Sequence, residues 1–198
     1  MATGDQISVR LAAGFPFVFL AAAYALARKR FFGDRALFLF VLFALAIPGV
    51  VVLLPQFQEI ASLGLIDTRR GVVLLYIATN LPLAVFLMRP AFAGVPEELV
   101  ESMRIDGASG FGIFRQLFLP FASSTIVAVA VFVAAMAWNE LTLAVTVLHT
   151  PSLFTLPIVM ALHFGSPLGT WVLMAGPLLL LVTTRRVLRR GVTAGALI

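Results

Sequence analysis

The sequence predicts an all-α integral membrane protein with about five transmembrane helices. Of its 198 residues, 61% are hydrophobic and only 12% are charged. The mean hydropathy of +1.07 lies far above that of soluble domains. The charged residues form short clusters between long apolar runs, and apolar runs of this length are typical of membrane spans.

The basic character of the chain indicates its topology. The net charge is +5 and the pI is near 11. The basic residues flank the apolar runs, whereas a nucleic-acid interface would combine a basic patch with interleaved aromatic residues. The absence of cysteine excludes disulfide and thiol chemistry. We therefore expect a lipid bilayer, and no nucleic acid, among the partners.

The first three spans are predicted at residues 11–27, 36–54 and 71–88. The first span ends at the basic cluster Arg28-Lys29-Arg30. The second contains Pro48-Gly49, which favours a kink or break inside the membrane.

The last two spans are predicted at residues 117–139 and 168–184. The polar pair Asn139-Glu140 interrupts the fourth span. The uncharged stretch that follows is too long for one span and contains several prolines, so residues 151–165 are interpreted as an interfacial or re-entrant piece. We expect the whole chain to form a single transmembrane domain.

The distribution of Lys and Arg predicts the orientation. The loops at 28–35 and 89–116 and the C-terminal tail together hold eleven of the fourteen basic residues. That side should be the cytoplasm, because basic residues are retained inside. With five spans, the N-terminus lies outside and the C-terminus in the cytoplasm.

The one charge-dense segment of folding length between the apolar runs is residues 96–116, which should form two short helices. Pro96 suits a first helical position, and Glu97 and Glu98 favour the positive end of the helix dipole. Gly107 allows a turn, and Ser109 can cap the second helix. Leu99, Val100 and Met103 share one face of the first helix, while Phe111 and Phe114 project three residues apart on the second.

The charge balance of this segment favours a protein partner over a lipid surface. Four acids stand against two bases, whereas helices that lie on an anionic leaflet are rich in Lys and Arg. The alternative interpretation is an ordinary solvated loop, since acidic helical turns are common.

The stretch from Glu101 to Pro120 resembles the EAA loop of ABC-importer permease subunits. The resemblance rests on the spacing of Glu101, Gly107 and Leu119-Pro120, although Ser102 and Met103 replace the two alanines and Leu117 replaces the isoleucine. The run from Arg104 to Ala108, RIDGA, is similar to the carbohydrate-uptake, maltose/trehalose-type branch, which depends on a binding protein.

The resemblance covers nearly the whole chain. It extends through Ala23–Arg28, Ile47-Pro48, Asp67-Thr68, Trp138-Asn139-Glu140, Phe154–Pro157 and Arg190–Ala196. Permeases of this branch usually have six spans, and this chain lacks a counterpart of the first. We interpret it either as a reduced five-span version or as a chain with a misassigned start.

The resemblance implies a type I ABC importer permease core in a bacterial inner membrane, for carbohydrate uptake. It implies a second permease, two copies of a cytoplasmic ATPase and an external solute-binding protein as partners. ATP and Mg would belong to the ATPase, and this chain, which has no G-x-x-x-x-G-K-S/T loop, should bind no cofactor. The implied ATPase-coupling residues are Glu97, Glu98, Glu101, Arg104, Asp106, Gly107, Phe111, Leu119 and Pro120.

Three polar residues are candidates for the translocation path. Asn80, Asn139 and Glu140 lie within or beside apolar spans, and an intramembrane carboxylate suggests function. The alternative is that Glu140 lies at the outer interface, where water or Asn139 satisfies it. A rival function is an ion-coupled secondary transporter that uses Glu140, which inverted repeats would favour; the sequence shows none.

Enzymatic and metal chemistry are not expected. His149 and His163 lack metal-ligand spacing and have no nearby acid, and no Ser/His/Asp set is suggested. We therefore expect no catalytic residue and no metal site in this chain.

Overall fold

The computed structural model describes residues 17–28, 32–162, 175, 178–179 and 182, and every regular element within them is helical. The first helical segment is Phe17–Arg28. It is followed by α2 (Asp34–Ala46), α3 (Gly49–Ser62), α4 (Arg69–Ala93), α5 (Glu97–Ile105), α6 (Gly110–Ile113), the π-helix η1 (Phe114–Phe118), α7 (Leu119–Phe121), α8 (Ser123–Trp138), α9 (Thr142–Val147), the 3-10 helix η2 (Pro151–Leu153) and α10 (Leu156–Leu162). Residues 11–16 and nearly all of the predicted span 168–184 lie outside the described residues.

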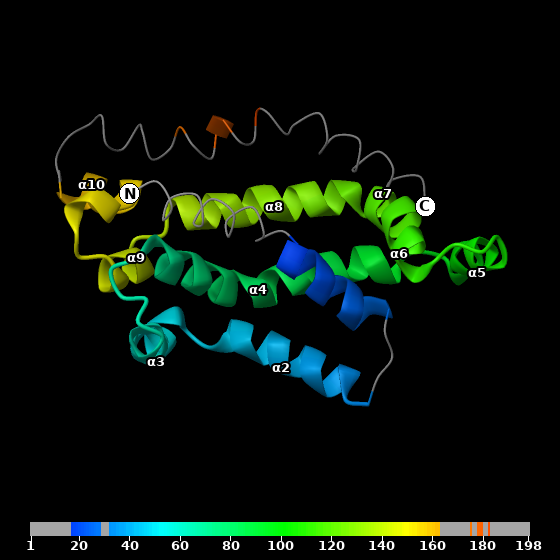
Figure 1. Cartoon of the computed structure of the whole chain (residues 1–198), viewed down its shortest axis with the longest axis horizontal. Helices are drawn as coiled ribbons and strands as arrows, with labels where there is room; N and C mark the ends of the chain where they lie inside the picture. Colours follow the sequence, from blue (N-terminus) through cyan, green and yellow to red (C-terminus); the bar gives the residue numbers. More distant parts are fainter. Residues whose placement is uncertain (1–16, 29–31, 163–174, 176–177, 180–181, 183–198) are drawn as a thin grey trace.

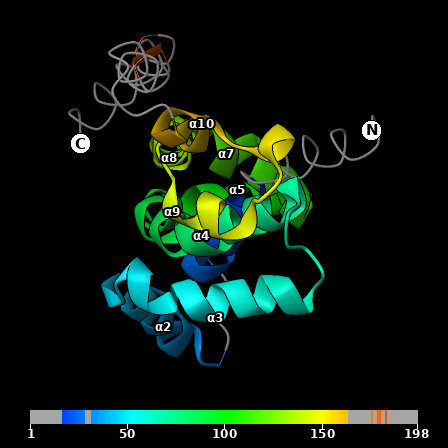
Figure 2. The same cartoon turned by 90° about the vertical axis from the view of Figure 1, so that its left-hand side faces the viewer.

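Helix α4 is the central element of the bundle. Its 25 residues extend over roughly 37 Å, and within the described part of the chain it is the one unbroken helix long and apolar enough to cross a membrane. Figure 1 and Figure 2 show α8 on one side of it and α2 with α3 on the other. Contacts to α2, α8 and α9 hold α4 in the middle.

The predicted break in the second span is confirmed. Helices α2 and α3 meet at 108° around Ile47-Pro48 and can only be one span if that span is bent. Ile47, the C-cap of α2, has extended backbone angles, and Pro48 is the N-cap of α3. A proline cannot donate a backbone hydrogen bond, which makes it a natural break point.

A second bend was not predicted. The expected fourth span was a continuous run from residue 117, but the chain turns by 73° between α7 and α8. The bend lies at Ala122, which separates α7 from α8 and has φ −87° and ψ 3°, outside the α-helical region. Alanine favours helix and the whole stretch is apolar, so the sequence pattern suggested one straight helix.

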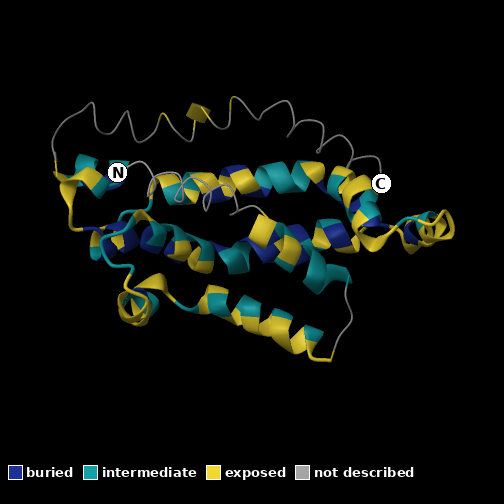
Figure 3. Ribbon diagram, in the orientation of Figure 1, coloured by how far each residue is buried: buried dark blue, intermediate teal, exposed yellow. Residues whose placement is uncertain are grey.

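Within the described part of the chain, the buried side chains form two clusters, toward opposite ends of α4. The first gathers Phe19, Ala23, Val85, Phe92 and Phe118 with their neighbours. The second gathers residues of α3, α4, α9 and α10, which include Ile60, Leu75, Val147 and Ile158. Figure 3 shows this burial concentrated on α4, while α2 has no buried residue.

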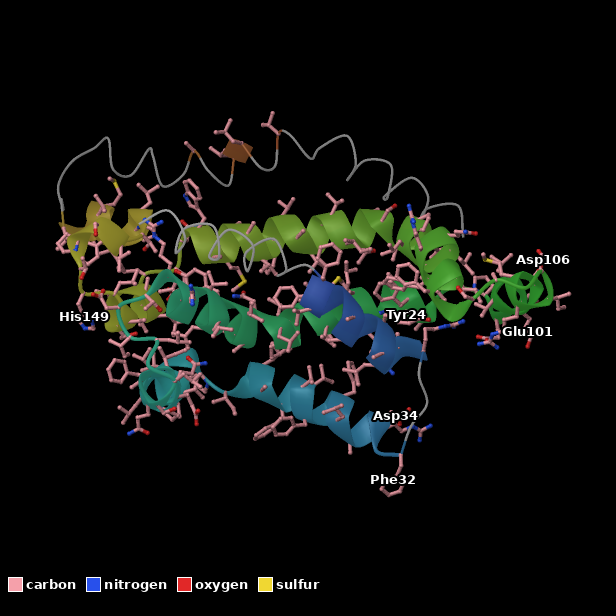
Figure 4. All side chains as sticks on the ribbon, viewed as in Figure 1. Tyr24, Phe32, Asp34, Glu101, Asp106 and His149 are labelled. Carbon is pink, nitrogen blue, oxygen red and sulfur yellow. The ribbon has the colours of Figure 1, made fainter. Side chains whose placement is uncertain are left out.

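The two ends of the bundle carry different loops. The end of Phe17–Arg28, the start of α2 and the whole of α5 lie at one end, whereas the loop before α4 and the loop after α9 lie at the other (Figure 4). The predicted inner loops around 28–35 and 89–116 therefore share one end of the molecule. That this end faces the cytoplasm stays a prediction from charge.

Candidate functional site

The predicted coupling segment, residues 96–116, projects from the end of the bundle (Figure 1). Helix α5 begins at Glu97, so Pro96 is the N-cap and not the first helical residue as expected. Glu97 and Glu98 lie in the first turn and Arg104 in the last, which matches the sign of the helix dipole at both ends.

The turn at Gly107 is confirmed. Gly107 has a φ of +81°, a left-handed conformation that favours glycine. The N–H of Gly107 donates to the carbonyl of Arg104 at 3.0 Å, and that of Ala108 donates to Met103 at 3.0 Å. These bonds satisfy the last carbonyls of α5 and reverse the chain.

The predicted cap of the second helix is also confirmed. The Oγ of Ser109 accepts a hydrogen bond from the N–H of Gly112 at 3.1 Å. Helix α6 then passes into η1 and α7, which contains Leu119 and Pro120. The two helices meet at a glycine, as the sequence predicted.

The outer surface of the segment combines acids with exposed apolar side chains. Glu98, Glu101, Arg104 and Asp106 are exposed, and Figure 4 shows Glu101 and Asp106 at the tip, away from the bundle. Leu99, Ile105 and Phe111 are also exposed. Apolar side chains left exposed beside charged residues are available for contact with a protein partner.

The inner side of the segment packs against the bundle. Val100 is buried and Met103 is half-buried, so of the three residues predicted on one face, two turn inward and Leu99 does not. Phe114, which we expected to project, instead packs on Tyr24 with ring centroids 4.8 Å apart. Phe111 does project.

Tyr24 and Arg28 join the coupling segment to the first helical segment, and the sequence analysis did not identify them as site residues. The Tyr24 ring makes edge contacts with Phe92, Phe114 and Phe118. The Nη2 of Arg28 donates to the Oε2 of Glu97 at 2.6 Å. In the sequence, the run from Ala23 to Arg28 stands out only through the family resemblance.

A cavity of about 250 Å³ lies at this junction. Its lining includes Tyr24, Arg28, Glu97, Arg104 and Phe118. Glu97 therefore faces the bundle and differs from the other predicted coupling acids, which face outward.

The three predicted path residues have local partners. The Nδ2 of Asn80, which is buried, donates to the carbonyl of Tyr76 at 2.8 Å. The Nδ2 of Asn139 donates to Ala135 at 2.8 Å in the same manner. Both amides bond one turn back along their own helix.

Glu140 caps α9. Its carboxylate accepts hydrogen bonds from the N–H groups of Leu143, at 2.8 Å, and Ala144, at 3.1 Å. The hydroxyl of Tyr76 donates to the backbone carbonyl of Glu140 at 3.3 Å, which joins α9 to α4. That these residues line the path stays a prediction.

An apolar cavity of about 290 Å³ lies between the first helical segment, α4 and α8. Its lining includes Phe19, Tyr76, Met88, Val129 and Ala137, and none of the three predicted path residues is among the described residues that line it.

At the other end of the molecule, Asp67 fixes the loop that follows α9. Its Oδ1 accepts hydrogen bonds from the N–H groups of His149, at 2.8 Å, and Thr150, at 2.9 Å, and its Oδ2 accepts one from the Thr150 hydroxyl. These bonds, led by the Thr150 hydroxyl, lower the pKa of the Asp67 carboxyl to about 2. Asp67 has a φ of 56°, which Asp tolerates better than most residues. In the sequence, Asp67-Thr68 stands out only as one of the runs that resemble the permease family.

No group of three or more His, Cys, Asp or Glu side chains within the described residues could hold a metal ion. His149 contributes its backbone N–H to Asp67. His163 lies outside the described residues.

Comparison with known proteins links this geometry to a family. The arabinooligosaccharides transport system permease protein AraQ of Halalkalibacterium halodurans is 37% identical over 161 residues, which are 80% of this chain and 57% of AraQ. The trehalose transport system permease protein SugB of Mycobacterium tuberculosis is 35% identical over 145 residues, 73% of this chain and 53% of SugB. The chain thus spans somewhat more than half the length of these relatives.

The fold also matches a solved structure. A chain of a bacterial ABC transporter involved in the import of the acidic polysaccharide alginate superimposes with a TM-score of 0.73 at 19% identity, over 96% of this chain and 72% of that one. The shared fold is that of a type I ABC importer permease. The family model for the binding-protein-dependent transport system inner membrane component matches residues 14–191. This chain belongs to that family of inner membrane transport components.

Proposed function

We propose that this chain is the transmembrane permease subunit of an ABC importer for a carbohydrate. The observation that carries the proposal is the coupling segment, which projects from one end of the bundle and exposes acids beside apolar side chains. The relatives named for arabinooligosaccharide and trehalose transport support a carbohydrate as the solute.

The proposed partners are a second permease, two copies of a cytoplasmic ATPase and an external solute-binding protein. The ATPase binds ATP and Mg and carries out hydrolysis. In this chain, five exposed residues of the coupling segment contact the ATPase: Glu98, Glu101, Arg104, Asp106 and Phe111. Gly107 provides the turn, and Leu119-Pro120 anchors the segment to the bundle.

Movement of the docked segment then opens the path to one side of the bacterial membrane. We place the N-terminus outside and the C-terminus in the cytoplasm. Asn80, Asn139 and Glu140 are retained as candidate path residues. The ion-coupled secondary transporter is not supported, because the similar proteins are named as transport system permease proteins and the family is one of binding-protein-dependent transport.

Reconstitution tests this proposal. The complex purified through this chain would be placed in liposomes, and uptake of labelled oligosaccharides would be measured with its binding protein added. We expect uptake that requires both ATP and the binding protein. Uptake driven by an ion gradient without ATP would contradict the proposal.

A further inference from the structure

We propose that Arg28 is a positioning residue that connects the coupling segment to the first helical segment, Phe17–Arg28, and passes the movement of α5 into the bundle. Glu97 is its partner within the chain and not a contact to the ATPase. This inference rests on the proposed function, which requires that movement of the coupling segment reach the membrane helices. It names the contacts that transmit this movement.

Through one guanidinium group, Arg28 contacts the coupling segment and the residues on both sides of it. Its Nη2 donates to the Oε2 of Glu97 at 2.6 Å, and its Nη1 donates to the carbonyl of Val95 at 3.3 Å. The guanidinium carbon lies 4.9 Å from the centre of the Phe118 ring, within cation–π distance. The residue thus holds the linker before α5, the first residue of α5 and the π-helix η1.

The burial of the Arg28 side chain favours a fixed geometry for its contact with Glu97. The Arg28 side chain is only 15% exposed, while that of Glu97 is 57% exposed. A guanidinium that is largely removed from water and stacked on an aromatic ring is held in one geometry, and its fork of donors suits two acceptors at once. Lysine has neither the fork nor the flat face.

Tyr24 reinforces the same junction. It lies four residues before Arg28, and residues at this spacing share a helix face. Its ring contacts Phe92 at the end of α4, and Phe114 and Phe118 in η1. Residues before, within and after the coupling segment therefore contact the same face of the first helical segment.

A second arginine, Arg89, connects the end of the first helical segment to α4 and α2. The Nε of Arg89, on α4, donates to the carbonyl of Leu26 at 3.0 Å, and its guanidinium lies 4.1 Å from the centre of the Phe38 ring on α2. The end of the first helical segment is thus attached to α5 through Arg28 and to α4 and α2 through Arg89. A rotation of α5 must either move this end or break these contacts.

A double-mutant cycle tests the pairing. Arg28→Ala, Glu97→Ala and the double variant would be compared in the purified complex, with Glu98→Ala as the matched control from the next position of α5. The readout is solute transported per ATP hydrolysed, together with the amount of ATPase that copurifies.

We expect each single variant to lower transport per ATP by about tenfold, within the range measured for contacting residues, while the ATPase stays bound. The double variant should be no worse than Arg28→Ala, because the pair acts as one unit. Arg28→Lys, which keeps the charge, should lose less. Glu98→Ala should reduce ATPase binding, and its effect should add to that of Arg28→Ala.

A second measurement does not depend on transport. The chain has no cysteine, so spin labels can be placed at Ala21→Cys and Ser102→Cys, two exposed positions on the first helical segment and α5. We expect the distribution of label distances to broaden when Arg28 or Glu97 is replaced by alanine, and to stay narrow with Glu98→Ala.

Two outcomes would overturn the inference. One is that the losses from Arg28→Ala and Glu97→Ala add in full, with loss of the ATPase in Glu97→Ala. The other is an unchanged label distribution. If the wild-type complex shows no ATP-dependent transport, the proposed function fails and the inference fails with it; additive losses in an active complex reject the inference alone.

Discussion

At the scale of single residues, Asp67 and Gly107 show two ways in which one side chain, or its absence, fixes a loop. The Asp67 carboxylate gathers three donors from His149 and Thr150. Gly107 places the chain in a left-handed turn that a side chain would strain. For each residue, a substitution has an expected effect on local structure that can be measured separately from transport.

Replacing Asp67 with asparagine should loosen the loop that follows α9. Asparagine keeps an acceptor oxygen and tolerates the positive φ, but it loses the charge. Because the folded pKa is lowered from 3.8 to about 2, the contribution of the carboxylate is present above pH 3.8 and is lost as the pH falls through about 2. We expect lower hydrogen-exchange protection of the His149 and Thr150 amides in Asp67→Asn between about pH 5 and about pH 8.

The difference in protection should narrow as the pH approaches the folded pKa of Asp67, where the wild-type carboxyl also becomes neutral. Asp34→Asn, at the opposite end of the molecule, is the control and should leave the two amides unchanged. Equal protection in wild type and Asp67→Asn at neutral pH would contradict the role of the charge.

Replacing Gly107 should damage coupling through backbone strain. Apart from its two chain neighbours, no residue has an atom within 4 Å of where the Cβ of a side chain at this position would lie, so only the backbone conformation opposes a substitution. Gly107→Ala should cost about 1–2 kcal/mol of local stability, and Gly107→Asn less. Thermal unfolding of the purified complex and transport per ATP would measure both effects.

Gly110→Ala is the matched control, because Gly110 also has open space but lies in the first turn of α6 without a positive φ. It should behave as wild type. If Gly107→Asn and Gly107→Ala were equally harmful, or both harmless, the left-handed turn would not be the reason for this glycine.

At the scale of elements, the short helix α9 depends on Glu140. The carboxylate satisfies two N–H groups at the start of a helix of six residues. Glu140→Ala should cost about 0.5–2 kcal/mol, as loss of a helix cap does. Glu140→Gln keeps one acceptor and should retain most of the stability and the transport.

Thermal unfolding and uptake by the same pair of variants separate the two roles of Glu140. Loss of uptake in Glu140→Gln with normal stability would contradict a purely capping role and would favour a charged residue in the path.

Local features of the elements could be predicted from the sequence, whereas contacts between distant residues could not. The turns of the coupling segment were predictable because Gly107 and Ser109 act on residues within one turn of themselves. The Asp67 contact to Thr150 joins residues 83 positions apart, and the Arg28 contact to Glu97 joins residues 69 apart. No local pattern encodes such pairs, so the sequence identified Glu97 as a coupling residue but not its partner.

The bend between α7 and α8 marks a further limit. Pro120 was identified as an anchor, but a proline at the start of a helix is compatible with a straight continuation. The turn itself lies at Ala122, and alanine is the residue least expected to interrupt a helix.

At the scale of the whole molecule, α4 links two ends that carry different sets of contacts. One end carries the coupling segment and the Arg28 and Tyr24 contacts, and the other carries the loop that Asp67 fixes. Exposed apolar side chains cover α2 and α3, among them Phe40, Phe43 and Val50. Such surfaces suit lipid or a second permease.

We propose that the coupling segment attaches this chain to a cytoplasmic ATPase. Affinity purification of the chain from its native membrane in mild detergent, followed by mass spectrometry of the bound proteins, tests it most directly. We expect a nucleotide-binding ATPase and a second permease, with the ATPase lost when Glu101 and Gly107 are replaced together. Recovery of the chain alone, or only as a homo-oligomer, would contradict the claim.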